Sequence, residues 1–265
     1  MNILITGSSG FVATKLIKEL QKIKGEHFLC LIDKKNDGVD ITNYKRMDYV
    51  FSEFKPDIVI HLAAYLGNDL LPNLKHNVIG TRNVVQLCKK YKVKKLIFTS
   101  SAAVYGNNCN ALETDYLHPI NFYGMAKKYC ERIIRKSGVP YVILRLSNVY
   151  GKKGKGIVSR LLEDNKPTIT SPLHYTRDFV HCSDVCNAII LALNSKVVNE
   201  TINISTGRET MLHSLQQLTN TKPNVMIRKK KEIKFSCLDN SKAIKLLKWK
   251  PKVDLVTGIK NYDKL

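Results

Sequence analysis

Two side chains four residues apart, Tyr123 and Lys127, carry the strongest chemical signal in this sequence of 265 residues. Residues with this spacing lie on the same face of a helix, so the phenol and the ammonium would be neighbours. A free tyrosine has a pKa near ~10 and is a poor base at neutral pH. A positive charge beside it favours the phenolate, which could then take a proton from a substrate hydroxyl. A helix tyrosine packed at the edge of the core is the alternative interpretation.

A serine at the end of a predicted strand strengthens the catalytic interpretation. Ser101 stands 22 residues before Tyr123 and would hydrogen-bond the same substrate oxygen. Its neighbour Ser100 competes for this role. A tyrosine and a lysine at this spacing arise by chance in lysine-rich helices, but a serine-bearing strand end followed by this pair is the order that builds an active site.

A glycine-rich turn lies near the start of the chain. Gly7 and Gly10 follow the apolar residues 2–6 and precede a helical pattern that begins at Phe11. The first glycine permits a tight turn, and the second lets the backbone approach a pyrophosphate at the positive end of the helix dipole. The third position of such motifs is usually glycine and is Ala13 here. An ordinary strand–helix turn is the alternative.

Asp33 ends the second predicted strand and makes a dinucleotide site the better interpretation of that turn. A carboxylate at this position binds the hydroxyls of the adenosine ribose. It also favours NAD over NADP, because it would repel a 2′-phosphate. Lys34 and Lys35 follow directly and could weaken that repulsion, so NADP stays an alternative.

The elements that must position these residues follow a regular order. Short β-branched segments alternate with helical patterns, which is typical of βαβ units and a parallel sheet. The predicted strands are residues 2–6, 28–32, 57–62, 95–100, 141–146 and 201–204. The predicted helices are residues 11–24, 44–54, 77–91, 121–137, 183–193 and 241–247. We therefore expect an α/β fold with a Rossmann-type, doubly wound parallel sheet, whose ligands bind at the carboxyl ends of the strands.

The alternation loosens after about Gly151, which suggests a second part of the molecule. We expect residues 1–150 to form a dinucleotide-binding domain that also carries the catalytic residues. We expect residues 151–265 to form mainly a smaller, discontinuous lobe that binds the substrate, with some segments returning to the first domain.

The composition bounds the class of protein. Apolar residues make up 44% of the chain and charged residues 25%, as in soluble globular proteins. No apolar run approaches the ~18 residues that a membrane span needs, and the N-terminus has no signal-peptide pattern. Seven irregularly spaced cysteines suggest neither a disulfide framework nor a metal site. We therefore expect a cytoplasmic protein with free thiols, no metal and no membrane partner.

The net charge of +21 admits two interpretations. Nucleic-acid binding through a basic face is one of them. The basic residues are mostly lysine and are spread along the chain, without an arginine-rich arm or the aromatic side chains of single-strand binders. We therefore expect a solvated surface and no nucleic-acid partner. A positive field would also attract a dinucleotide, which is an anion.

At these residues, and over roughly residues 2–260, the chain resembles the extended short-chain dehydrogenase/reductase family. Within it, the chain is similar to the NAD-dependent nucleotide-sugar epimerases and dehydratases. The segments that carry the resemblance are Gly7 to Ala13, Thr99 to Gly106, Tyr123 to Lys127, Arg145 to Gly151 and Arg177 to Val185. The resemblance implies NAD as the cofactor. It also favours Ser101 over Ser100, because Ser101 stands four positions before Tyr105.

The resemblance further implies a set of binding residues and an assembly. The residues expected at NAD are Gly7, Gly10, Phe11, Val12, Asp33, Asp40, Ile41, Leu62, Ala63, Ala64, Asn77, Tyr123 and Lys127. The residues expected at the nucleotide sugar are Ser101, Asn148 and Arg177, with the arginine on the diphosphate. A surface salt bridge to Asp178 is the alternative for Arg177. The family also implies a homodimer through the helices that follow residues 77 and 121.

The reaction that we expect is NAD-dependent epimerisation at C4 of a nucleotide-activated hexose, most simply a UDP-hexose, through a 4-keto intermediate. A 4-keto-sugar reductase and a 4,6-dehydratase are the alternatives within the family. A non-catalytic protein that binds a dinucleotide or a nucleic acid is the alternative from another class. Intact Ser101, Tyr123 and Lys127 argue against that last interpretation.

Two alanines separate this chain from the related dehydratases. Those enzymes have an Asp-Glu pair directly after the serine or threonine that precedes Val-Tyr-Gly, and the pair moves the protons of dehydration. The corresponding residues here are Ala102 and Ala103. Glu113 and Asp115 lie beyond the next turn, and the sequence leaves open whether they reach the site.

Overall fold

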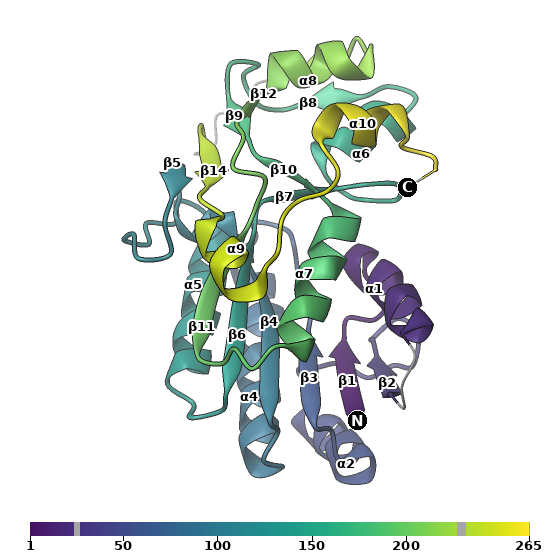
Figure 1. Ribbon diagram of the computed structural model, residues 1–265, viewed down its shortest axis with the longest axis vertical. Coiled ribbons are helices and arrows are strands. Elements are labelled where there is room, and N and C mark those ends of the chain that lie inside the picture. The colour runs from purple at the N-terminus through teal and green to yellow at the C-terminus, as the bar shows by residue number, and fades with distance from the viewer. Residues whose placement is uncertain (24–26, 227–231, 265) are drawn as a thin grey trace.

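A computed structural model describes residues 1–23, 27–226 and 232–264, and its central feature is a parallel sheet of six strands (Figure 1). The strands of this sheet are β1 (Asn2–Thr6), β2 (Phe28–Ile32), β3 (Ile58–His61), β4 (Lys95–Ser101), β6 (Tyr141–Leu146) and β11 (Glu200–Ile204). Their order is β2-β1-β3-β4-β6-β11, and all neighbours are parallel. The predicted Rossmann-type sheet is thereby confirmed.

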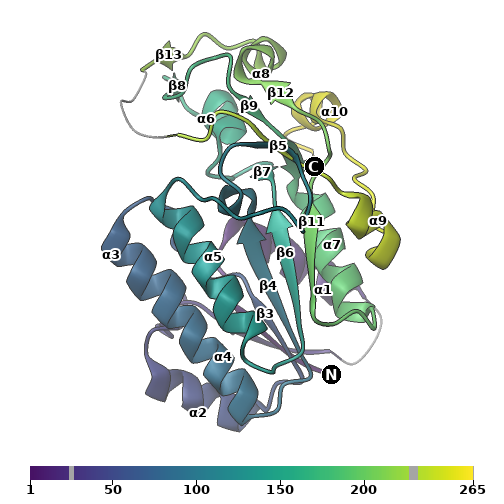
Figure 2. The same ribbon diagram turned by 90° about the vertical axis from the view of Figure 1, so that its left-hand side faces the viewer.

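Helices cover both faces of this sheet (Figure 2). One face packs against α1 (Phe11–Lys22), α7 (Cys182–Asn194) and α9 (Ser241–Leu247). The other packs against α2 (Tyr44–Phe54), α4 (Gly80–Lys90) and α5 (Phe122–Arg135). Side chains alternate between the faces: Ile3 and Ile5 lie in the first core, and Leu4 lies in the second. Burial on both faces explains why these strands read as continuous apolar runs.

The chain changes direction across the sheet between β1 and β3. From β1 it runs outward to β2 at one edge, then returns past β1 to β3 and continues to the other edge. Ligands of open α/β sheets bind at such a switch point, outside the carboxyl ends of the strands. The glycine-rich turn follows β1 at this point.

One helix begins earlier than the sequence predicts. The helical segment predicted from residue 77 starts seven residues sooner as α3 (Leu70–Pro72) and continues as the π-helical η1 (Asn73–Ile79) into α4. Pro72 favours an end to a helix when read from sequence. Here it stands in the first turn, where its missing N–H removes no helical hydrogen bond.

Short elements gather beyond the carboxyl ends of the sheet strands (Figure 1). The short strands pair two by two: β7 (Asn148–Tyr150) with β10 (Phe179–His181), β9 (Thr176–Arg177) with β12 (Thr210–Met211), β8 (Thr168–Ile169) with β13 (Asn224–Val225), and β5 (Asn108–Ala111) with β14 (Ser236–Leu238). The helical elements here are η2 (Ala102–Val104), α6 (Ile157–Glu163), α8 (Leu212–Thr219) and α10 (Leu255–Lys260). No described helix is both long and apolar enough to cross a bilayer.

Candidate active site

The structure brings the three predicted catalytic residues together at the carboxyl end of β4. Ser101 ends that strand, and Tyr123 and Lys127 lie on α5, which packs beside it. The Ser101 hydroxyl lies within hydrogen-bonding reach of the Tyr123 phenol. The Lys127 ammonium lies 5.9 Å from the centre of the Tyr123 ring and donates a hydrogen bond to the backbone oxygen of Thr99 at 2.8 Å.

Two local features hold Tyr123 against Ser101. Asn121 caps α5, because its side-chain oxygen accepts a hydrogen bond from the Gly124 N–H at 2.7 Å. Gly124 then lets the helix approach the turn that follows Ser101. A Cβ on this glycine would lie only 2.4 Å from the backbone oxygen of Ala103, so any other residue would push the helix away.

Burial sets the charge states of this trio. It lowers the pKa of Lys127 to about 8, against the opposing influence of Cys130 and Glu131, so the ammonium is still mainly protonated at pH 7. Burial raises the pKa of Tyr123, and the hydrogen bond with Ser101 opposes that rise. A positive nicotinamide beside the phenol would also oppose this rise in the pKa of Tyr123, and it would therefore favour the phenolate.

The glycine-rich turn fits a dinucleotide. Gly7 has a φ of +72°, and a Cβ there would lie 2.7 Å from the backbone of Ala63, the segment that follows β3. Gly10 stands at the N-cap of α1, and no described side chain caps the helix. The first N–H groups of α1, at Phe11 and Val12, therefore remain available for a pyrophosphate.

Asp33, the predicted ribose ligand, lies beside this turn. Its carboxylate accepts hydrogen bonds from the backbone N–H groups of Lys35 at 2.8 Å and Ser9 at 3.2 Å. Burial alone would raise the pKa of Asp33, but these bonds outweigh it and the pKa lies below the ordinary value. Lys34 points to Asp40, with its ammonium 3.2 Å from the carboxylate. That ion pair engages one of the two lysines expected to favour a 2′-phosphate.

The other predicted NAD residues lie near the same edge of the sheet. Ile41 is buried in the core that α4 covers, and its backbone oxygen accepts a hydrogen bond from Asn83. Leu62, Ala63 and Ala64 follow β3 and are half-buried. Asn77 donates to the backbone oxygen of Tyr65 at 2.9 Å and to Asn73 at 2.7 Å. Both of its amide protons are thus engaged in positioning the segment after β3.

The two residues predicted only for the substrate lie on the short paired strands. No described residue hydrogen-bonds the side-chain amide of Asn148, which leaves it available to a ligand. One nitrogen of Arg177 donates to the backbone oxygens of Thr176 and Lys234. No hydrogen bond or ion pair among the described residues joins either side chain to Tyr123.

The alternative interpretation of Arg177 is wrong. Asp178 is buried, and no salt bridge among the described residues joins it to Arg177. Its carboxylate instead accepts hydrogen bonds from the backbone N–H groups of Thr206 and Gly207, each at 3.0 Å. The guanidinium of Arg177 is therefore not neutralised by Asp178.

Glu113 and Asp115, whose reach the sequence leaves open, are both engaged elsewhere. The Glu113 carboxylate accepts a hydrogen bond from the Asn203 N–H on β11 at 2.8 Å. The Asp115 carboxylate holds the turn at Leu112 and Asn108. The residues directly after Ser101 are two buried alanines, as the sequence says.

The sequence alone does not point to two buried polar residues near the site, His61 and Glu131. His61 on β3 bridges Thr6 and Thr81 at 2.6 and 3.0 Å, and burial, with the charge of Lys127, lowers its pKa to about 3. Glu131 lies one turn after Lys127 on α5 and is fully buried. Its position four residues after Lys127, on the same helix face, is the signal that would have pointed to it. No group of described histidines, cysteines or carboxylates could hold a metal ion.

Comparison with known proteins shows the family to which this chain is similar. Residues 3–205 match the NAD dependent epimerase/dehydratase family. The structure is similar to that of a UDP-glucose 4-epimerase with UDP-glucose from Thermotoga maritima, with a TM-score of 0.87, 32% identity, and 99% and 97% of the two chains covered. It is also similar to a UDP-glucuronic acid 4-epimerase from Bacillus cereus in complex with UDP-glucuronic acid and NAD, with a TM-score of 0.87, 26% identity and coverage of 99% and 98%.

A relative with a different reaction is also similar over most of the chain. A GDP-6-deoxy-D-talose 4-dehydrogenase from Aggregatibacter actinomycetemcomitans is 31% identical over 234 residues, which are 82% of this chain and 79% of that one. The chain belongs to the NAD-dependent epimerase/dehydratase family. It is therefore an enzyme with NAD as its cofactor, and the resemblance recognised in the sequence is confirmed.

Asp33→Ala should narrow the preference of the protein for NAD over NADP. The change removes the carboxylate that is predicted to bind the ribose and to repel a 2′-phosphate. Titration of the apo-protein with both cofactors measures the two dissociation constants, and their ratio should move toward one. Glu53→Ala, which removes an exposed carboxylate on α2, is the matched control and should leave the ratio unchanged. A wild-type protein that already prefers NADP would contradict the role given to Asp33.

Proposed function

We propose that this enzyme interconverts the C4 epimers of a nucleotide-activated hexose, with a UDP-hexose as the substrate. The observation that carries the proposal is the grouping of Ser101, Tyr123 and Lys127 at the carboxyl end of β4, with two alanines directly after Ser101. The relatives from Thermotoga and Bacillus, both 4-epimerases of UDP-sugars, support the choice of reaction.

The chain's own residues account for the proton steps of this reaction. Bound NAD supplies the acceptor, and later the donor, of the hydride at C4. Tyr123 takes the proton of the 4-hydroxyl, and Ser101 hydrogen-bonds the same oxygen. Lys127 stabilises the phenolate by its charge. After the 4-keto sugar has turned over in the pocket, Tyr123 returns the proton to the oxygen at C4, now with the opposite configuration.

Dehydration is disfavoured because no acid stands where it is needed. Loss of water across C5 and C6 requires one group to protonate the leaving hydroxyl and another to take the C5 proton. Methyl groups at Ala102 and Ala103 can do neither. Glu113 and Asp115 are the nearest acids that follow in sequence, and both hold backbone N–H groups elsewhere.

Product analysis tests the proposal. The purified enzyme is incubated with a panel of UDP-, dTDP- and GDP-sugars that includes UDP-glucose and UDP-N-acetylglucosamine. We expect a product of unchanged mass with inverted configuration at C4 by NMR, and no net consumption of NAD. Loss of one water would show a dehydratase. Stoichiometric consumption of NADH with a 4-keto sugar would show a reductase, the reaction type that the Aggregatibacter relative suggests.

We also propose that the two halves of the chain bind different ligands. Residues 1–150 would hold NAD and the catalytic trio, and residues 151–265 would mainly hold the nucleotide sugar, with Asn148 and Arg177 near the boundary. Two observations support this division. The Asp178 carboxylate binds backbone N–H groups and does not neutralise Arg177, and the side-chain amide of Asn148 is available to a ligand. Arg177→Ala should raise the KM for the nucleotide sugar and leave the affinity for NAD unchanged.

A homodimer is the assembly that we propose. Exposed apolar side chains line two helical segments that pack side by side, α3 with η1 and α5 (Figure 2). These side chains are Leu70, Leu71, Leu74, Phe122, Met125 and Tyr129. A second copy placed on this face would remove them from water. The mass in solution, measured by light scattering, should be that of two chains and should fall to that of one in Leu71→Glu.

We further propose a cytoplasmic location. All seven cysteines are free thiols, and five of them are buried. Unpaired thiols are the rule in a reducing compartment. Detection of the enzyme by cell fractionation outside the cytoplasm would contradict the proposal.

A further inference from the structure

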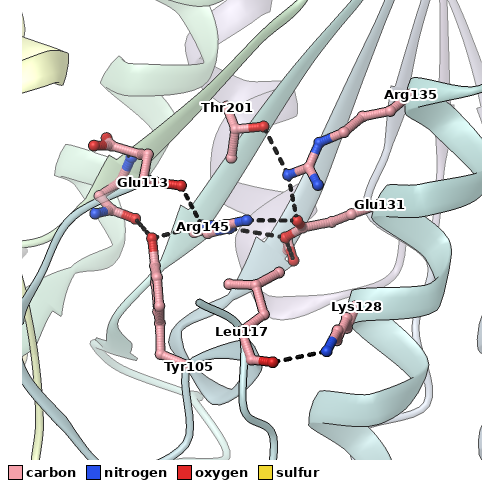
Figure 3. Close-up of polar contacts among 10 residues, drawn as sticks. Tyr105, Glu113, Leu117, Lys128, Glu131, Arg135, Arg145 and Thr201 are labelled. Atoms are coloured by element: carbon pink, nitrogen blue, oxygen red, sulfur yellow. Dashed lines mark hydrogen bonds and ion pairs between the residues drawn. The ribbon is translucent and has the colours of Figure 1, made fainter. Parts of the chain in front are cut away.

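A buried polar cluster lies between α5 and the carboxyl ends of β4, β6 and β11 (Figure 3). Its centre is Glu131 on α5, which is fully buried, and its main partner is Arg145 on β6, which is 1% exposed. The guanidinium forms a two-pronged ion pair, with Nε 3.0 Å from Oε1 and Nη2 2.8 Å from Oε2. Such planar pairing is specific in geometry as well as strong.

The remaining contacts make the cluster continuous across three strands. Ser100 on β4 donates its hydroxyl to Glu131 at 2.6 Å. Arg145 donates to the Tyr105 hydroxyl at 2.6 Å, and that hydroxyl donates to Asn203 on β11 at 2.8 Å. Ser100, Arg145 and Asn203 are register partners, so they lie in one row across the sheet. Arg135 adds a second cation to Glu131 at the outer side, 2.7 Å away.

Stability alone does not explain this cluster. Two charges taken out of water pay a desolvation penalty that their attraction roughly offsets. A well-packed apolar pair of similar volume would serve the core about as well, and often better. What an apolar pair does not supply is a fixed relative position of the helix and the strands, because apolar contacts are not directional.

The position of the cluster shows what it would fix. Glu131 lies one turn after Lys127 and two turns after Tyr123 on the same helix. Its hydrogen-bond partner Ser100 directly precedes Ser101 on β4. One carboxylate thus ties the element that carries the base to the element that carries the catalytic serine.

We propose that Glu131 is a positioning residue of this enzyme, which fixes α5 on β4 so that Tyr123 and Ser101 share the substrate oxygen. The inference rests on the proposed function, because it assigns the positioning to that reaction. Reacting groups need placement within about 0.5 Å, and a shift of about 1 Å can cost about 10²-fold in rate.

Ser100→Ala is the mildest test. It removes one hydroxyl from Glu131 and leaves the ion pair with Arg145 in place. We expect kcat to fall by about tenfold, with KM and the dissociation constant of NAD within about twofold of the wild type. Ser137→Ala is the matched control, because it also removes a serine hydroxyl, one that bonds the backbone of Ile134 and Val139 just beyond the far end of α5. It should leave kcat unchanged.

Replacement of the ion pair by apolar residues separates positioning from stability. Glu131→Gln alone would leave a buried guanidinium unpaired, so we choose the triple variant Ser100→Ala, Glu131→Leu, Arg145→Met. It should fold, with an unfolding temperature near that of the wild type, and bind NAD. Its kcat should fall by at least about 10²-fold while KM changes by less than about threefold.

The outcomes decide between the two hypotheses. A triple variant with the stability and kcat of the wild type would overturn the positioning role and leave the proposed epimerase standing. If the triple variant does not fold, the comparison of Ser100→Ala with Ser137→Ala decides, and equal kcat values overturn the role. Wild-type enzyme is assayed in parallel on the same panel of nucleotide sugars. Its failure to turn over any of them would overturn the proposed function, and the inference with it.

Discussion

Tyr123→Phe should lose about 10²–10⁴-fold in turnover and still bind NAD with nearly the affinity of the wild type. The phenol ring remains, so the packing of α5 on the turn after Ser101 is preserved. Only the hydroxyl is missing, and this is the group that we propose takes the proton from the substrate. Steady-state assays with the active nucleotide sugar, together with fluorescence titration of NAD, measure the two effects separately.

The matched control for this variant is Tyr129→Phe. Tyr129 lies on the same helix, among the side chains proposed to meet a second copy, and no described residue hydrogen-bonds its hydroxyl. Loss of this hydroxyl therefore leaves both the proposed chemistry and the apolar contact in place. Turnover should stay at the wild-type level. If Tyr123→Phe also kept near wild-type turnover, the base of the reaction would have to be a different group.

Lys127→Met should change the pH dependence of turnover as well as its size. Removal of the cation raises the pKa of Tyr123, because the phenolate loses the charge that stabilises it. Below that pKa each unit of increase lowers the phenolate fraction tenfold, so turnover at pH 7 should fall by about 10- to 10²-fold. The acid limb of the profile should move to higher pH, and part of the activity should return toward pH 9.

In the wild-type enzyme, turnover should change with pH in the opposite direction above neutral pH. Its Lys127 has a pKa of about 8, so the ammonium loses its proton as the pH rises through this value. Turnover should therefore decline above about pH 8 in the wild type, and the methionine variant should lack this decline. Superimposable profiles for the two proteins, over pH 6 to 9, would show that Lys127 does not control the charge of Tyr123.

The strands and the site motifs were predictable because they depend on local sequence. β1, β2 and β6 have the predicted bounds, since each is an apolar run between turn residues. The early start of the helix before Asn77 was not predictable, because a proline such as Pro72 usually marks a break in a helix. Only the structure shows that Pro72 lies in the first turn, where a proline is tolerated.

The hydrogen-bond networks around the site were also beyond the sequence. The pairing of Glu131 with Arg145 joins a helix to a strand, and no periodicity reveals which residues meet across that gap. The same is true of Glu113, whose carboxylate meets a backbone N–H ninety residues further along. Their roles depend on tertiary packing, whereas the glycine-rich turn and the tyrosine–lysine pair are recognisable from short segments.

The last strand of the sheet has a consequence for any attempt to divide this protein. β11 comes from residues 200–204 and pairs with residues 142–146 of β6, which would otherwise be the edge strand. A fragment that ended at residue 150 would leave the hydrogen-bonding groups of β6 open and would uncover the apolar face under α7. Open, apolar edge strands recruit other chains. We therefore expect a fragment of residues 1–150 to aggregate when it is expressed alone.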